Sequence, residues 1–237
     1  MSGLLLKIIA YAAMIIDHVG YVFFPSEPVF RIIGRLAMPI FCFFIAEGVR
    51  HTASRKIYLI RLAVAAAISE IPYRLCFHGT LEGFRMPENV IVTLFFGALA
   101  LFVTVYLAEK GLPAIVLALP CLAACVTCIL FDTDWTFLGV MMIFVFYFFK
   151  DDRKKLYFWI SGICIAAFVY DYVPALIEDH TTLPFTFFIH LCGILALIPI
   201  GYYNGKYIRS RARYLFYAVY PVHLIIIYVI RILIGNI

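Results

Sequence analysis

Asp17 and His18 lie side by side inside an otherwise apolar segment, residues 4–24. A charged side chain near the middle of a bilayer costs at least ~2.5–3.5 kcal/mol on insertion scales, and such groups usually face a bundle interior or a wet cavity. Imidazole is the side chain most often used for proton transfer near neutral pH, and a carboxylate can orient it. We therefore expect acid–base chemistry at this pair.

Other ionisable residues lie equally deep in apolar segments. Arg35 has the two-pronged donor geometry that holds a carboxylate, and it could reach Asp17 or Glu70, whereas Arg31 is better explained as a headgroup anchor. Glu70 lies in the third apolar segment, where it could pair with Arg35 and contact substrate. His223, in the last segment, is the second deep histidine and a second candidate base.

A dense group of basic and aromatic residues follows the second apolar segment. Arg50 and His51 end that segment, and Tyr58 and Arg61 begin the third. Guanidinium groups and the amides at a helix N-terminus bind phosphate, so this group could hold the phosphates of a cytosolic cofactor. The alternative is that these charges only mark the cytoplasmic side of the membrane.

The composition requires a membrane to surround these residues. Of the 237 residues, 65% are hydrophobic and 14% are charged, which excludes an ordinary soluble domain. A span needs about 20 apolar residues, and we expect about nine. They cover residues 4–24, 30–49, 57–77, 90–109, 112–131, 134–149, 156–175, 184–203 and 214–234. The expected fold is an all-α polytopic membrane protein, with residues 1–237 in one bundle and a kink at Pro39.

The first three predicted helices and the last carry nearly all of the buried ionisable groups, so we expect the chemical centre there. The net charge is +5, but most lysines and arginines fall at alternate helix ends. This asymmetry predicts a cytoplasmic N-terminus and an external C-terminus in a cell membrane. Topology explains the positive charge, so we expect no nucleic-acid partner.

Several strings in this chain resemble a known family. The strings are Ile16-Asp17-His18, Gly34-Arg35-Leu36-Ala37-Met38-Pro39, Glu47-Gly48-Val49-Arg50-His51-Thr52, Ser69-Glu70-Ile71-Pro72-Tyr73, Tyr203-Asn204-Gly205 and Tyr220-Pro221-Val222-His223. They resemble the TraX family, which is associated with N-terminal acetylation of conjugative pilin, and the resemblance covers essentially the whole chain. That family is similar in turn to integral-membrane acyltransferase-3 proteins, where an Arg and a His are separated by ten residues; here Lys7 and His18 have that spacing.

The resemblance implies an acyltransferase that uses acetyl-CoA and modifies an amine, such as the N-terminus of a pilin-like peptide, or a hydroxyl group. We expect the catalytic residues to be His18, Asp17, His223, Glu70 and Arg35. Residues expected to bind acetyl-CoA are Arg50, His51, Tyr58, Arg61, Lys7, Tyr217 and Tyr220. Residues expected to bind the acceptor are Glu47, Asn89 and Tyr73, although Asn89 could simply cap a helix. No metal site is expected.

A proton-coupled transporter of small molecules is the main alternative, because buried Asp17, Glu70, His18 and His223 could also form a proton relay. A non-catalytic scaffold is a third interpretation. The sequence leaves open the acceptor, the acyl group, which histidine is the base, and whether transfer is direct or passes through an acyl-enzyme.

Overall fold

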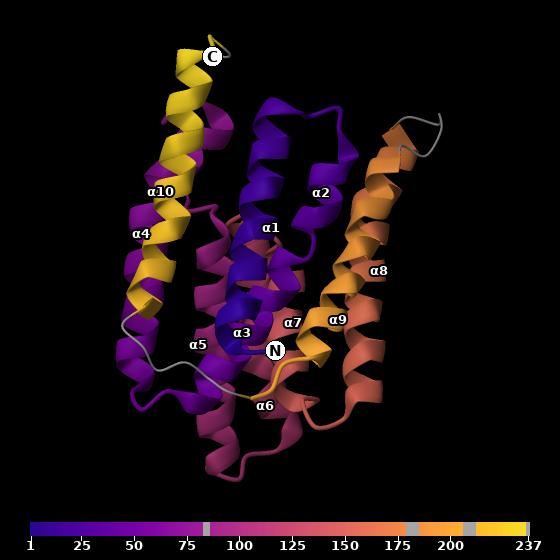
Figure 1. Cartoon of the computed structure of the whole chain (residues 1–237). Helices are drawn as coiled ribbons and strands as arrows, with labels where there is room; N and C mark the ends of the chain where they lie inside the picture. The colour runs from indigo at the N-terminus through magenta and orange to yellow at the C-terminus, as the bar shows by residue number, and fades with distance from the viewer. Residues whose placement is uncertain (83–85, 179–184, 206–211, 236–237) are drawn as a thin grey trace. The chain divides into compact units, whose positions relative to one another are not determined.

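The computed structural model describes residues 1–82, 86–178, 185–205 and 212–235, and every regular element within these ranges is helical (Figure 1). The elements are α1 Gly3–Phe23, α2 Pro28–Gly34, α3 Ala37–His51, α4 Arg55–His78, α5 Val90–Glu109, α6 Ala114–Leu130, α7 Thr136–Phe148, α8 Arg153–Glu178, the 3₁₀-helix η1 Phe185–Ala196, α9 Leu197–Gly201 and α10 Ala212–Leu233. The basic residues of segment 206–211, part of the predicted charge asymmetry, lie outside the described residues.

The helical fold class predicted from the sequence is confirmed. Within the described ranges, four helical stretches are long and apolar enough to cross a membrane: Gly3–Phe23, Pro28–His51, Val90–Glu109 and Leu215–Leu233. Shorter apolar helices cover Ala114–Leu130, Thr136–Phe148 and Phe188–Gly201. The protein is therefore a helical membrane protein, and the figure of nine spans stays a prediction.

Two of the predicted spans are each divided between two helices. The span predicted over residues 30–49 does not bend at the residue where we expected a kink. The chain breaks between α2, which ends at Gly34, and α3, which begins at Ala37. Pro39 was expected to kink the helix, but it lies in the first turn of α3, where backbone N–H groups have no helical acceptor and proline is tolerated. The span predicted over 184–203 is a 3₁₀-helix followed by one short α-helix.

The chain divides into two compact units, and each is described by itself. The first unit comprises Met1–Phe41 and Phe149–Ser210; in it α1 packs on α2, and η1 packs on α2, α8 and α9 (Figure 1). The second comprises Cys42–Phe148 and Arg211–Ile237; in it α4 lies between α5 and α10, while α5, α6 and α7 pack on one another.

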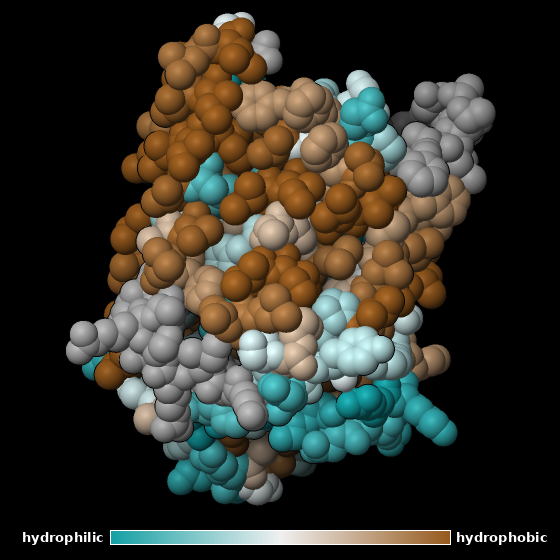
Figure 2. Space-filling model, viewed as in Figure 1, coloured by the Kyte–Doolittle hydropathy of each residue, from teal (hydrophilic) through white to brown (hydrophobic). Residues whose placement is uncertain are grey.

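The helices of the second unit expose apolar side chains and bury polar ones. On α4 the exposed residues Ile57, Ile60, Val64, Ile68 and Ile71 follow a helical repeat, while Ser69, Glu70 and Arg74 are buried. Helix α10 is similar: its surface is largely hydrophobic in Figure 2, and its His223 is buried. This inverted pattern is typical of helices that contact lipid on one side and a polar interior on the other.

Candidate functional site

The buried ionisable side chains of the described residues lie where the sequence predicted them. They are His18 in α1, Arg35 between α2 and α3, Glu47 in α3, Glu70 and Arg74 in α4, and His223 in α10. All belong to the first three predicted spans or the last, so this distribution is confirmed. His18 and Arg35 belong to the first unit and the other four to the second.

In the first unit, Asp17 forms an ion pair with Arg31, whose Nη1 lies 2.6 Å from Asp17 Oδ2. The Arg31 guanidinium also lies 5.2 Å from the centre of the Tyr21 ring. Our interpretation of Arg31 as a headgroup anchor is therefore wrong, because α2 directs it at α1. Arg35 lies within electrostatic range of the same carboxylate, and His18 is 9% exposed.

Gly34 makes this ion pair possible. A Cβ atom built on Gly34 would lie 2.0 Å from Asp17 Oδ1 and 2.3 Å from its Cγ. Non-bonded carbon atoms normally stay about 3.5–4.0 Å apart. Any side chain larger than hydrogen at Gly34 would therefore displace the Asp17 carboxylate from the position in which it meets Arg31.

In the second unit, five residues gather where α3 ends and α4 begins. We call Glu47, Arg50, His51, Tyr58 and Arg61 the α3–α4 cluster. Arg50 Nη1 donates to Glu47 Oε1 at 2.7 Å, and His51 Nε2 lies 3.5 Å from Glu47 Oε2. Four residues that we expected to bind acetyl-CoA therefore lie together. Glu47, which we expected to bind the acceptor, lies with them.

Arg50 is held by the protein itself. Its Nη2 donates to the carbonyl oxygens of Phe146, at 2.8 Å, and of Tyr147, and its guanidinium lies 4.7 Å from the centre of the Tyr147 ring. Helix α7 ends at Phe148, so these carbonyls belong to its last turn and attract a cation. The geometry gives Arg50 and Glu47 a structural task, joining α3 to α7.

Arg61 differs from Arg50. Its Nε is buried without a hydrogen-bond partner, and no ion pair involves Arg61 in the part of the chain that the structure describes. Its guanidinium lies 6.0 Å from the centre of the Tyr58 ring, one helical turn earlier on α4. A partly buried guanidinium without an acceptor could bind an anion from solution.

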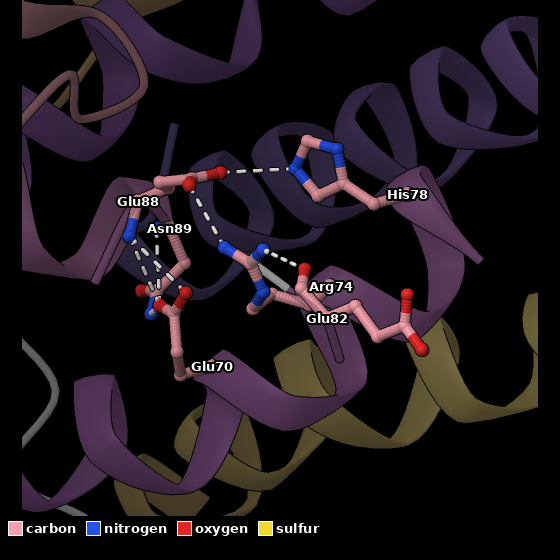
Figure 3. A network of polar contacts seen from close by, with 6 residues as sticks. All are labelled: Glu70, Arg74, His78, Glu82, Glu88 and Asn89. Carbon is pink, nitrogen blue, oxygen red and sulfur yellow. Dashed lines mark hydrogen bonds and ion pairs between the residues drawn. The ribbon is translucent and has the colours of Figure 1, made fainter. Parts of the chain in front are cut away.

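About 14 Å further along α4, a second polar group joins α4 to the start of α5 (Figure 3). We call Glu70, Arg74, His78, Glu88 and Asn89 the α4–α5 network. Glu70 accepts hydrogen bonds from the backbone N–H groups of Glu88 and Asn89, at 3.2–3.3 Å, and from Asn89 Nδ2 at 2.6 Å. Arg74 Nη1 lies 2.8 Å from Glu88 Oε1, and His78 Nε2 lies 2.9 Å from Glu88 Oε2.

The network shows what two of the predicted site residues contact. Within the second unit the Glu70 carboxylate contacts Glu88 and Asn89, and its pairing with Arg35, which belongs to the first unit, stays a prediction. Asn89 is fully buried and caps α5: its Oδ1 accepts from Ile91 N at 3.0 Å, and its Nδ2 also donates to Ala66 O at 3.0 Å. The cap is confirmed, and Asn89 has no exposed polar atom with which to bind an acceptor.

Helix α10 brings Tyr220 and His223 to the same end of α4 as this network. Tyr220 is within electrostatic range of Glu70 and Tyr73, and its ring centre lies 5.5 Å from that of His223. His223 Nδ1 lies 2.9 Å from the Val219 carbonyl oxygen and must donate to it. The neutral imidazole therefore keeps its lone pair on Nε2, the atom that would act as a base.

The other predicted acetyl-CoA ligands do not all join the α3–α4 cluster. Lys7 lies in α1 of the first unit, and Tyr217 lies on α10 one turn before Tyr220. Since Tyr220 lies at the level of Glu70 on α4, it is distant from Arg61 along that helix. The structure thus gathers Arg50, His51, Tyr58 and Arg61 and separates Tyr220 from them.

Sequence reasoning missed two features of these groups. Glu88 bridges Arg74 and His78, yet it stands in a loop beside Asn89 without any pattern of its own. Gly48 lies so close to Tyr58 that a Cβ atom at this position would be 2.4 Å from the Tyr58 hydroxyl oxygen. A glycine directly after a charged residue inside an apolar helix was the available signal, because such glycines mark places where another group approaches closely.

Comparisons with known proteins show which family the chain belongs to. The family model described as "TraX protein" matches residues 2–231. A Dichelobacter nodosus protein named "Probable fimbrial assembly protein FimC, serogroup H1" is 29% identical over 244 residues, covering 94% of this chain and 93% of its own length. A Rickettsia prowazekii (strain Madrid E) protein, RP591, is 58% identical over 40 residues, which are 17% of this chain and 16% of its own. No solved structure matches. By the match over residues 2–231, the chain belongs to the TraX family.

Proposed function

We propose that this protein is an integral-membrane acyltransferase that moves an acetyl group from cytosolic acetyl-CoA to an amine, the N-terminus of a pilin-like peptide, at or across the membrane. Membership of the TraX family supports this reaction, and the relative named as a fimbrial assembly protein supports a pilin-like acceptor. The fold is proposed to cross the cell membrane about nine times, with the N-terminus inside. The exposed apolar faces of α4, α6 and α10 support insertion in a membrane, and the basic residues at alternate helix ends support the orientation.

The observation that carries the proposal is that Arg61 has no carboxylate partner among the described residues. Acetyl-CoA is a polyanion, and its phosphates need cations whose donors are not already used. Within the described residues, Arg31, Arg50, Arg55 and Arg74 each have a carboxylate partner at 2.6–2.8 Å. Arg61 has none, and it lies in the α3–α4 cluster at the end of α4 that the proposed topology puts in the cytoplasm. It is therefore the proposed ligand of a phosphate group.

In the proposed reaction, the amine nitrogen attacks the thioester carbonyl, the C–S bond breaks, and CoA leaves as a thiol. A histidine takes the proton from the amine and passes it to the departing thiolate. Two candidates remain. His18 is adjacent to Asp17 and is separated from Lys7 by ten residues, as the His and Arg of related acyltransferases are. The hydrogen bond from His223 Nδ1 to the Val219 carbonyl puts the lone pair of the neutral imidazole on Nε2.

Calorimetry of acetyl-CoA binding to the purified protein tests the cofactor. We expect binding in the wild type and at least a tenfold weaker affinity in Arg61→Ala, since one bond between charged groups contributes roughly 1.5–3 kcal/mol. Lys110→Ala is the matched control. Lys110 is exposed and follows Glu109, which pairs with Arg55 at 2.6 Å, so the Lys110→Ala variant loses a cation at the same end of the second unit. A folded wild type that does not bind acetyl-CoA would contradict the proposal.

A further inference from the structure

The Tyr58 side chain of α4 packs against α3 in a space that is open because residue 48 is a glycine. A Cβ atom built on Gly48 would lie 2.4 Å from the Tyr58 hydroxyl oxygen, 2.8 Å from Cζ and 2.9 Å from Cε2. The clash would involve one whole edge of the ring rather than a flexible side-chain tip. Gly48 therefore fixes where the phenol ring lies.

The ring is held on its other sides as well. Tyr58 is 7% exposed, and its ring meets Phe102 of α5 edge to face, with 5.8 Å between the ring centres. The Arg61 guanidinium lies 6.0 Å from the ring centre, at the outer limit of a cation–π contact. Residues three apart on a helix share a face, so Tyr58 forms one wall beside the Arg61 side chain.

We propose that Tyr58 is a positioning residue for Arg61, and that Gly48 is required because it leaves room for the Tyr58 ring. This inference rests on the proposed function, in which Arg61 binds a phosphate group of acetyl-CoA. An arginine loses much side-chain freedom when it binds a ligand, and a wall that already restricts it lowers this cost. Arg50 needs no such wall, because Glu47 and the end of α7 hold it.

The distances set the size of the expected effect. Normal contact would require the Tyr58 ring edge to move by about 1 Å from a Cβ at Gly48. Phe102 blocks one direction, so the ring must move toward Arg61 or α3 must separate from α4. A displacement of about 1 Å can lower activity roughly 100-fold. We expect Gly48→Ala to weaken acetyl-CoA binding at least about tenfold.

Two other glycines provide matched controls. A Cβ on Gly97 would lie 2.4 Å from Ile143 Cδ1, so Gly97→Ala crowds the same unit to a similar degree, but at a flexible methyl group away from Tyr58. A Cβ on Gly162 in α8 would meet nothing within 4 Å. Both variants should bind acetyl-CoA within about twofold of the wild type, which separates a specific effect of Gly48 from general crowding.

A double-mutant cycle tests whether Gly48 acts through Arg61. Acetyl-CoA affinity is measured by calorimetry for the wild type, Gly48→Ala, Arg61→Ala and the double variant. If Gly48 and Tyr58 position Arg61, removing Arg61 from the Gly48→Ala protein should cost little more affinity. Additive losses, or unchanged affinity in folded Gly48→Ala, would overturn the inference.

Variants of Tyr58 test whether Tyr58 positions Arg61 if Gly48→Ala does not fold. Tyr58→Phe keeps the ring and should bind acetyl-CoA within about threefold of the wild type, whereas Tyr58→Leu removes the wall and should bind at least about tenfold more weakly, with no further loss when Arg61→Ala is added. Equal binding by the two Tyr58 variants would refute the positioning role. Absence of binding by the wild type would instead reject the proposed function, so the two failures are distinguishable.

Discussion

Replacing Glu70 with glutamine keeps the size of the side chain and removes its negative charge. In the α4–α5 network the Glu70 carboxylate faces donors only: the backbone N–H groups of Glu88 and Asn89 and the amide nitrogen of Asn89. A glutamine offers one acceptor oxygen, and its NH₂ group would point at one of these donors. Glu70→Gln therefore loses bonds and introduces a repulsive contact.

The structure gives the size of the loss. A hydrogen bond to a charged group contributes roughly 1.5–3 kcal/mol, and a buried donor left without an acceptor costs about 1–3 kcal/mol. Glu70 is 5% exposed and Asn89 is fully buried, so water does not replace the lost acceptor. We expect Glu70→Gln to lower the free energy of unfolding by about 3 kcal/mol. In a protein of this size that corresponds to a fall in Tm of about 6–12 °C.

Thermal unfolding of the purified protein in one detergent measures this shift. Glu82→Gln is the matched control, because Glu82 is exposed and contributes its backbone, rather than its carboxylate, to the contacts with Arg74 and Thr80. The control should stay within about 2 °C of the wild type. The reasoning about the network is refuted if Glu70→Gln and Glu82→Gln unfold at the same temperature.

Three further outcomes follow from the structure. Gly34→Ala should displace Asp17 and break its ion pair, so acetyl transfer should fall at least about tenfold in a protein that still binds acetyl-CoA; unchanged transfer would contradict this. Arg50→Gln should lower the Tm by about 4–8 °C, because it frees two carbonyls at the end of α7; an unchanged Tm would show that they need no cation. The hydrogen bond from the Lys155 backbone amide, and the Lys155 ammonium, hold the pKa of the Asp152 carboxyl below its usual range. The ionised Asp152 carboxylate should stabilise the fold fully above about pH 4, and this stabilisation should disappear as the pH falls through the lower pKa of the folded state. The difference in Tm between the wild type and Asp152→Ala should therefore close on acidification. A difference that does not change with pH would contradict a stabilising role for the carboxylate.

The helical fold and the positions of the buried charges followed from the sequence because both depend on local properties. Long apolar runs predict helices of membrane length, and a charge inside such a run must face the protein interior, as His18, Glu70 and His223 do. The cap formed by Asn89 was also readable, since an asparagine before an apolar helix is a standard N-terminal signal.

The partners of these charges depend on packing between distant segments, and the sequence could not supply them. Arg31 and Arg35 are one turn apart, and the sequence pointed to Arg35 as the partner of Asp17, whereas the structure places Arg31 Nη1 2.6 Å from Asp17 Oδ2. Arg50 finds its acceptors at the end of α7, 96 residues away at Phe146. No periodicity encodes such a contact.

Acetyl transfer by the protein in liposomes tests the central claim most directly. The protein is supplied with acetyl-CoA and a peptide that copies the N-terminus of a pilin, and N-acetylated peptide and free CoA thiol are measured together. An acyltransferase releases one CoA for each acetylated peptide, does not act on a peptide whose amine is blocked, and loses activity in His18→Ala or His223→Ala while still binding acetyl-CoA. A folded protein that binds acetyl-CoA but yields no acetylated peptide, or equal activity in both histidine variants and the wild type, would contradict the account.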